Sequence, residues 1–435
     1  MKRALVLALT LAACARGGAN DALEDAAPSP NASILPAPLA TAPQPLADPA
    51  ATSPRAVGIL ADDAGRLLLP SDAAPPPAPP VLPRSDLALD ADPLGTHEQP
   101  GVTLEAEWRM ADLPAAPRAP EVNGAGLDAA RKLATLRWTI DLSHGGRMRV
   151  AFASRAMPLA QGTEIRARTD RYGHVLVWPD GDQYRTLTPG AVRTLLGERR
   201  ADAIPLLRPQ VGAESDGPHR AGLATRRFDV TTGAGKLSLE QAKVPEAGEG
   251  GPLLCRLLTE LVAVDPSVAP CAEGRMPVRA QYAWPHGGGI TFEVVGVQKR
   301  TDLPAGTLLT PPPAARFAAG ALPPSTTGIF FTRDELASWR SRPLDLGPVT
   351  APGAPGEGIL LVNGSDVLRY VLLDGIPIAW VAPGAAHAQY LIGPQRGRYG
   401  VQWRTFLGDA VEAPRTVELP ARVTFGFAAD ASAPH

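Results

Sequence analysis

Alternation of apolar and polar residues marks a strand most clearly between residues 135 and 142. From Leu136 onward every second side chain is apolar, and polar or charged side chains occupy the positions between them. A period of two is typical of a strand with one buried and one solvated face. Turn-forming residues follow at 143–146, and the alternation resumes at Met148. We therefore predict a hairpin over residues 135–152.

The same pattern recurs along the chain and predicts an antiparallel body. Alternating stretches flank four more turns, at residues 170–173, 179–182, 233–235 and 285–289. Hairpins joined by short turns form a meander with one face on a core and the other face in water. We expect residues 101–342 to form this mainly β body, with a few helices.

Three stretches break the strand pattern and predict helices. Thr188-Pro189 opens the first, because proline suits the first helical position. Leucines from Leu253 to Leu261 follow a helical spacing and indicate a buried helix. Thr332 with Glu335 three positions later has the capping-box pattern.

A second, smaller β region follows a Pro- and Gly-rich linker at residues 343–358. Six short strands are predicted within residues 359–427, and Asp374-Gly375 is a hairpin signal. Strands spaced this closely predict a small sandwich. The run of residues 373–377, with Pro383-Gly384 and residues 397–399, resembles the PEGA-type β-sandwich modules of bacterial surface proteins. That resemblance implies no catalytic site.

The chain before the body has a different composition. Residues 15–100 contain 17 prolines, 11 acids and four arginines, and they lack Phe, Tyr and Trp. Such a segment buries too little apolar surface to offset its chain entropy. We expect residues 14–100 to form an acidic, disordered tether. Its one apolar patch, at residues 56–60 and 66–69, could pair as a hairpin or dock on the body.

The first 14 residues have the parts of an export signal. Lys2-Arg3 precede ten residues that are apolar except for Thr10, and this run is too short to span a membrane. Leu11-Ala12-Ala13-Cys14 resembles the lipobox of bacterial lipoproteins. The resemblance implies removal of residues 1–13, a lipid on Cys14 and an envelope location, and Ala15 favours the outer membrane. A plain secretory signal and a buried N-terminal element are the alternatives.

The two remaining cysteines suggest a structural bond. With Cys14 acylated, Cys255 and Cys271 are an even number in an exported protein. A helix followed by a return loop can bridge their 16 positions, so we predict a disulfide. Two independent buried thiols are the alternative.

No stretch of the sequence predicts catalysis, so we expect no enzyme, cofactor or metal. His286 and three glycines match an esterase oxyanion loop, but the Gly-x-Ser-x-Gly elbow that such enzymes require does not occur. The formal net charge of −2 gives no footprint for nucleic acid. Four arginines alternate outward on neighbouring predicted strands, and we interpret them as solvated outer faces or as a stripe facing an anionic envelope polymer: Arg147, Arg149, Arg166 and Arg168. The body carries +3 and the tether −7, so the two are expected to attract each other.

These observations favour a non-enzymatic envelope lipoprotein that binds an envelope protein or polymer and is held to the membrane by the lipid on Cys14. The alternative is an amphiphile carrier or sensor. Residues 226–232 and 237–241 resemble strands of the half-barrel of lipoprotein-localisation factors, which implies a sheet curled around a cavity. A large dry pocket in the body would favour the carrier, and a solid core would favour the binding scaffold.

Overall fold

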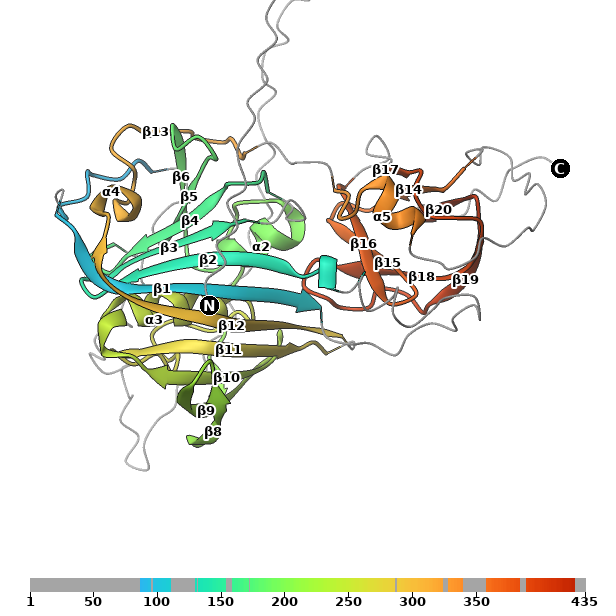
Figure 1. Ribbon diagram of the computed structural model, residues 1–435. Helices are drawn as coiled ribbons and strands as arrows, with labels where there is room; N and C mark the ends of the chain where they lie inside the picture. The colour runs from blue at the N-terminus through green and yellow to red at the C-terminus, as the bar shows by residue number, and fades with distance from the viewer. Residues whose placement is uncertain are drawn as a thin grey trace, which may run out of the picture. The chain divides into compact units, whose positions relative to one another are not determined.

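The computed structural model describes residues 87–94, 97–110, 130, 132–153, 159–171, 173–285, 288–323, 328–338, 357–383 and 389–426. The prediction of a mainly β protein is confirmed (Figure 1). Within these residues the strands form one large sheet and two small ones. Among them, no helix is both long and apolar enough to cross a membrane.

The large sheet is a meander, with β1 joining its two halves. It runs in the order β13 (Arg316–Phe317), β6 (Gln183–Leu187), β5 (His174–Val177), β4 (Glu164–Arg168), β3 (Arg147–Phe152), β2 (Leu136–Ser143), β1 (Gln99–Met110), β12 (Gly289–Leu303), β11 (Arg275–Ala283), β10 (Gly235–Lys243), β9 (Leu223–Thr232) and β7 (Gln210–Val211), and β8 (Ser215–Arg220) also pairs with β9. These pairs are antiparallel, except that β13 runs parallel to β6.

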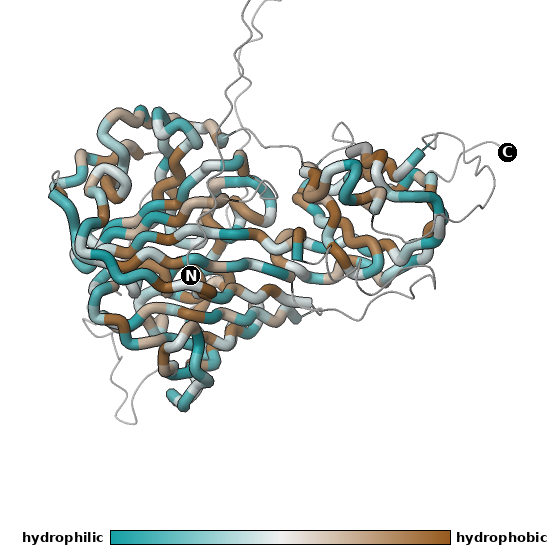
Figure 2. Tube along the Cα trace, viewed as in Figure 1, coloured by the Kyte–Doolittle hydropathy of each residue, from teal (hydrophilic) through white to brown (hydrophobic). Residues whose placement is uncertain are grey.

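The hairpins predicted from alternation are confirmed. The first pairs β2 with β3, from Trp138 opposite Phe152 to Ser143 opposite Arg147. The pairs β4–β5, β5–β6, β9–β10 and β11–β12 complete the set. Brown and teal positions alternate along these strands in Figure 2, as expected for strands with one buried face.

Helix α3 (Gly250–Glu260) covers the inner face of the large sheet, and α2 (Ala191–Glu198) packs against α3. The chain forms α2 (Ala191–Glu198), α3 (Gly250–Glu260), α4 (Ala305–Leu308), α5 (Arg333–Ala337) and a short 3-10 turn, η1 (Pro245–Ala247). The predicted first helix begins two residues late, because Gly190 at φ 89° forms its N-cap. The capping box at Thr332 and Glu335 is confirmed.

The space between α3 and the sheet is filled with side chains. Leu254 and Leu258 of α3 have no exposed surface, and neither do Leu104, Leu142 and Val150 of the sheet. Protein interiors are packed as closely as organic crystals, so we expect these buried side chains to hold one arrangement. These side chains form part of the buried core between α3 and the sheet.

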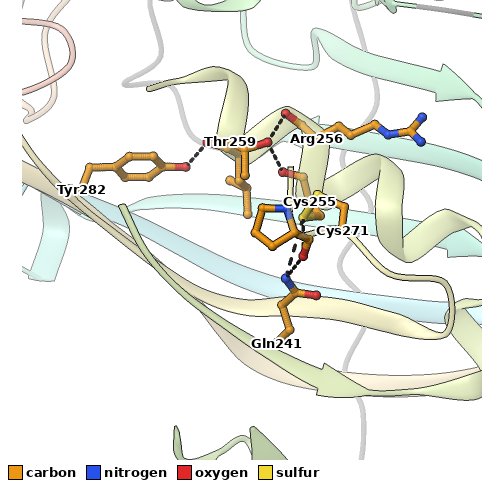
Figure 3. The surroundings of a disulfide bond; sticks show 8 residues. Gln241, Cys255, Arg256, Thr259, Cys271 and Tyr282 are labelled. Atoms are coloured by element: carbon orange, nitrogen blue, oxygen red, sulfur yellow. Dashed lines mark hydrogen bonds between the residues drawn. A yellow bond between two sulfur atoms is a disulfide. The ribbon is translucent and has the colours of Figure 1, made fainter. Parts of the chain in front are cut away.

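A disulfide ties α3 to the sheet (Figure 3). The predicted bond between Cys255 and Cys271 is present, with a Cα–Cα distance of 5.6 Å. The Tyr282 hydroxyl on β11 also donates a hydrogen bond to the Leu258 carbonyl, at 2.6 Å. The two links fix the second half of α3 against β11.

The C-terminal region forms two small facing sheets. One has the order β17 (Gln389–Leu391), β14 (Ile359–Asn363), β20 (Ala421–Phe425), and the other β16 (Ile376–Val381), β15 (Arg369–Leu373), β18 (Gly397–Thr405), β19 (Arg415–Leu419). The Asn363 side chain donates to the Val381 carbonyl and links them, at 3.0 Å. The pair β14–β20 is parallel.

The boundary of the tether differs from the prediction. Residues 87–94 lie against the body, and β1 begins at Gln99, before the predicted start of the body at 101. The tether therefore ends at or before residue 86. Residues 14–86 and the linker at 343–356 lie outside the described residues.

Candidate functional site

The four outward arginines of β3 and β4 form a compact cluster. Arg147 stands opposite Arg168, and Arg149 stands opposite Arg166. Like charges directly opposite each other on a sheet are destabilising unless they are neutralised. The prediction of solvated outer faces is wrong for three of them, since Arg147, Arg166 and Arg168 are buried. The alternation gives the face on which a side chain lies, but not what covers that face.

Half of the cluster is neutralised within the sheet. Arg149 donates to Glu164 at 2.7 Å and to Asp141 at 3.0 Å. Arg166 donates to the other oxygen of Glu164 at 2.8 Å. Burial lowers the pKa of Arg166, and the neighbouring Glu164 opposes that shift. These two guanidiniums need no partner from elsewhere.

In the other half, Arg147 depends on residues 87–94, which we call the strap, while Arg168 pairs with Asp170 at 3.2 Å. Both oxygens of Asp92 accept hydrogen bonds from Arg147, at 2.8 and 2.9 Å, and the Asp92 side chain is 1% exposed. Asp92 also accepts the backbone N–H groups of Leu94 and Thr310, both at 2.9 Å. Burial alone would raise the pKa of Asp92, but these hydrogen bonds lower it overall.

The strap continues across β5 and β6 through side-chain contacts. The Tyr184 hydroxyl accepts the Leu89 N–H at 3.0 Å, and the Thr186 hydroxyl donates to the Leu87 carbonyl at 2.9 Å. Asp90 accepts a hydrogen bond from Arg171 at 2.6 Å. The acidic side chains of the strap therefore pair with arginines of the body, the kind of attraction that the charges predict.

A hollow of about 600 Å³ lies under the strap. Its apolar wall includes Leu87, Leu89, Val175 and Leu187, and its polar wall includes Arg168 and Arg171 together with three threonines, Thr186, Thr188 and Thr310. Much of this volume is open to solvent, and the enclosed part is about 130 Å³, which is less than the usual volume of a pocket for a drug-sized ligand. The arrangement suits an anionic group joined to an apolar segment.

A second, smaller hollow, with an enclosed volume of about 30 Å³, shares the lining residues Arg171, Gly173 and His174 with the first. Its lining includes Arg256 and the buried pair of His174 and Glu260, whose facing atoms lie 3.3 Å apart. Glu260 also accepts the N–H groups of Gly190 and Val192 at the start of α2. The carboxyl group thereby joins α3 to α2.

The His174–Glu260 pair is neutral near pH 7. Burial, with a smaller contribution from the positive Arg256, lowers the pKa of His174 to about 4. Burial raises the pKa of Glu260 to about 8, although its two backbone donors oppose the shift. Between these values one proton stays on Glu260, facing the neutral imidazole. Among the described lining residues of both hollows there is no serine or cysteine, and the described chain has no cluster of three metal-ligating side chains.

The sequence and the structure identify different residues. Cys14, His286 and Gly287 lie outside the described residues. Cys255 and Cys271 form the disulfide and line neither hollow. Sequence reasoning missed Asp92, His174 and Glu260 as site residues. Only the outward alternation of the arginines pointed to this part of the body.

Comparisons with known proteins give only a distant likeness. No family model and no curated protein matches the chain. A LolA superfamily protein from Nitrosomonas europaea is 11% identical, with a TM-score of 0.23 over 48% of this chain and 90% of that chain. An outer membrane lipoprotein-sorting domain from Vibrio parahaemolyticus is 9% identical, with a TM-score of 0.24 over 47% and 87%. Likeness at this level carries no functional conclusion.

Proposed function

We propose that the protein is a non-enzymatic bacterial envelope lipoprotein that binds another envelope component through the outer face of β3–β6. The observation that carries the proposal is the arginine cluster with a hollow of about 600 Å³ beside it. This surface combines fixed cations with an apolar wall, which is the composition of a recognition site rather than of a smooth outer face.

The anchor is part of the same proposal. The lipobox motivates lipidation at Cys14, an envelope location and attachment to the outer membrane. We expect an alkyne fatty acid fed to cells to label the wild type and not Cys14→Ser. Equal labelling of both would place the anchor elsewhere and remove the basis for the envelope location.

Photocrosslinking in intact cells tests the binding surface. A photoreactive amino acid at Leu87, which is 51% exposed, is expected to capture one protein partner that mass spectrometry can identify. Val295 on β12 is the matched control, because it is an aliphatic side chain of similar exposure, 53%, outside the strap. Equal capture at both positions, or capture at neither, would contradict binding at this face.

The carrier is a second candidate, supported by the two hollows that share Arg171 and His174 in their linings. Arginines beside apolar walls suit an anionic amphiphile. Native mass spectrometry of the purified protein distinguishes the two functions. A bound lipid that is lost in Arg171→Gln would support the carrier, whereas a lipid-free protein with a crosslinked partner supports the scaffold.

A further inference from the structure

The strap is held in the way that a bound peptide is held. Residues 87–94 lie outside the strand ladder and across the face of the sheet. Their backbone bonds to side chains of the body, at Tyr184 and Thr186, and their carboxylates bond to Arg147 and Arg171. A strand built into the sheet would instead pair backbone with backbone.

The sheet alone does not neutralise the surface under the strap. The carboxylates of Asp141 and Glu164 accept hydrogen bonds from Arg149 and Arg166. Arg147 and Arg168 have only Asp170 of the following turn as a nearby acid from the sheet side, at 3.6 and 3.2 Å, and its side chain is 42% exposed. A buried guanidinium without a close partner is costly. Arg147 therefore requires an acidic occupant, whereas Arg168 has Asp170 and the Thr310 carbonyl as partners within the body.

The strap does not fill its groove. The hollow of about 600 Å³ remains beside it, and Leu87 at its outer end is half exposed. Leu89 reaches a small apolar cluster of Val175, Val177 and Tyr184 on β5 and β6. An occupant with a larger apolar residue at either position would bury more surface than the strap does.

We infer that the outer face of β3–β6 is a peptide-binding groove that the strap occupies in cis, and that it accepts an extended acidic peptide in trans. The partner has an apolar residue at the place of Leu89, and carboxylates at the places of Asp90 and Asp92. This inference rests on the proposed function and names the class of partner. Because the strap lies between the tether and β1, it can leave the groove while the sheet stays intact.

The competition between the two occupants is unequal. A segment attached close to its site acts at an effective concentration in the millimolar range. The strap therefore excludes a free peptide of equal intrinsic affinity until its own contacts are weakened. Neutralising the strap is the way to expose the groove.

A labelled peptide with the sequence of residues 85–98 tests the inference by fluorescence anisotropy on the full-length chain. We expect the double variant Asp90→Asn/Asp92→Asn to bind it at least about tenfold more tightly than the wild type, since a hydrogen bond to a charged group contributes about that factor. The same peptide with both aspartates changed to asparagine is expected to bind the variant about tenfold more weakly. Adding Arg147→Gln is expected to abolish the gain.

Two controls keep the result decisive. Asp90→Asn alone changes a side chain that is 82% exposed, so it reports on the groove if the double variant fails to fold. Equal binding to wild type and variant, or binding that does not depend on the aspartates of the peptide, would overturn the inference. A crosslinked partner at Leu87 without peptide binding would leave the proposed function standing and remove only the acidic-peptide groove.

Discussion

Two buried carboxyl groups in the body, Asp92 and Glu260, have opposite electrostatic surroundings. Asp92 faces the guanidinium of Arg147 and two backbone N–H groups, and its pKa is lowered. Glu260 faces a neutral imidazole and two backbone N–H groups, and burial raises its pKa to about 8. Backbone donors are common to both, so the charged partner decides the protonation state. The outer face is thus held by an ion pair, and the inner one by a neutral pair.

Arg147→Leu is expected to have the largest effect. It leaves the Asp92 carboxylate buried without its cation, and breaking such a pair costs about 3–5 kcal/mol. Chemical denaturation of the full chain measures the loss. Asp92→Leu/Arg147→Leu should recover much of it, because no charge is then stranded. A matched change at an exposed pair, Arg200→Leu beside Asp202, should leave stability unchanged. A loss as large at Arg200 would show that burial is not the cause.

Removing the disulfide is expected to cost about 3 kcal/mol in the chain-entropy model, because the bond closes a loop of 16 positions. Cys255→Ala/Cys271→Ala tests this, with denaturation at pH 7 as the readout. The contacts between Asp92 and Arg147 lie on the other face of the sheet. The losses of stability caused by removing the disulfide and by Arg147→Leu should therefore add. A thiol assay on the denatured, unreduced mature protein should find no reactive cysteine. Two reactive thiols would show that no bond forms.

The pH dependence of stability should separate the two carboxyl groups. Glu260 has a folded pKa above its unfolded value of 4.5, so its contribution is complete at low pH and is lost as pH rises toward 8. His174, with its pKa lowered from 6.5 to about 4, adds stability as pH rises to 6.5. Up to pH 6.5 the gain in stability from His174 opposes the loss from Glu260. Above pH 6.5, of these two groups, only Glu260 changes the stability.

We therefore expect the wild type to lose up to about 2 kcal/mol between pH 6.5 and 8, at roughly 1.4 kcal/mol per proton per pH unit. Glu260→Gln should abolish this loss, because the amide can still accept from Gly190 and Val192 and does not ionise. Denaturation curves across this range provide the measurement. An unchanged slope in the variant would show that Glu260 is not the titrating group. Asp92→Asn should leave the slope as it is, since the Asp92 pKa lies below this range.

Local patterns in the sequence predict the strands well. The alternation from Leu136 onward gave the β2–β3 hairpin with its inward face, and the count of exported cysteines gave the Cys255–Cys271 bond. The hairpin depends on a periodicity within one segment, and the disulfide depends on the even number of cysteines that remain in the exported chain. The order of β1 between β2 and β12 was not predictable, because it joins positions almost 200 residues apart.

The site was missed because its parts are distant and compositionally ordinary. Asp92 lies 55 positions from Arg147, in a stretch whose proline and acid content is typical of disorder. Glu260 sits among helix leucines, and its role depends on a turn at Gly190 that is 70 positions away. Composition describes the average behaviour of a segment, whereas a few specific contacts hold residues 87–94 on the body.

Hydrogen exchange of the full-length chain tests most directly whether the strap is a separate occupant of its groove. We expect the amides of Leu89 and Leu94 to exchange at least about tenfold faster than those of β3 and β4, because the strap opens without unfolding the sheet. Asp92→Asn should accelerate the strap further and leave Met148 and Val150 of β3 unchanged. Strap amides that exchange as slowly as the β3 core, and that speed up only together with it, would show that residues 87–94 are a fixed part of the fold and would contradict the account.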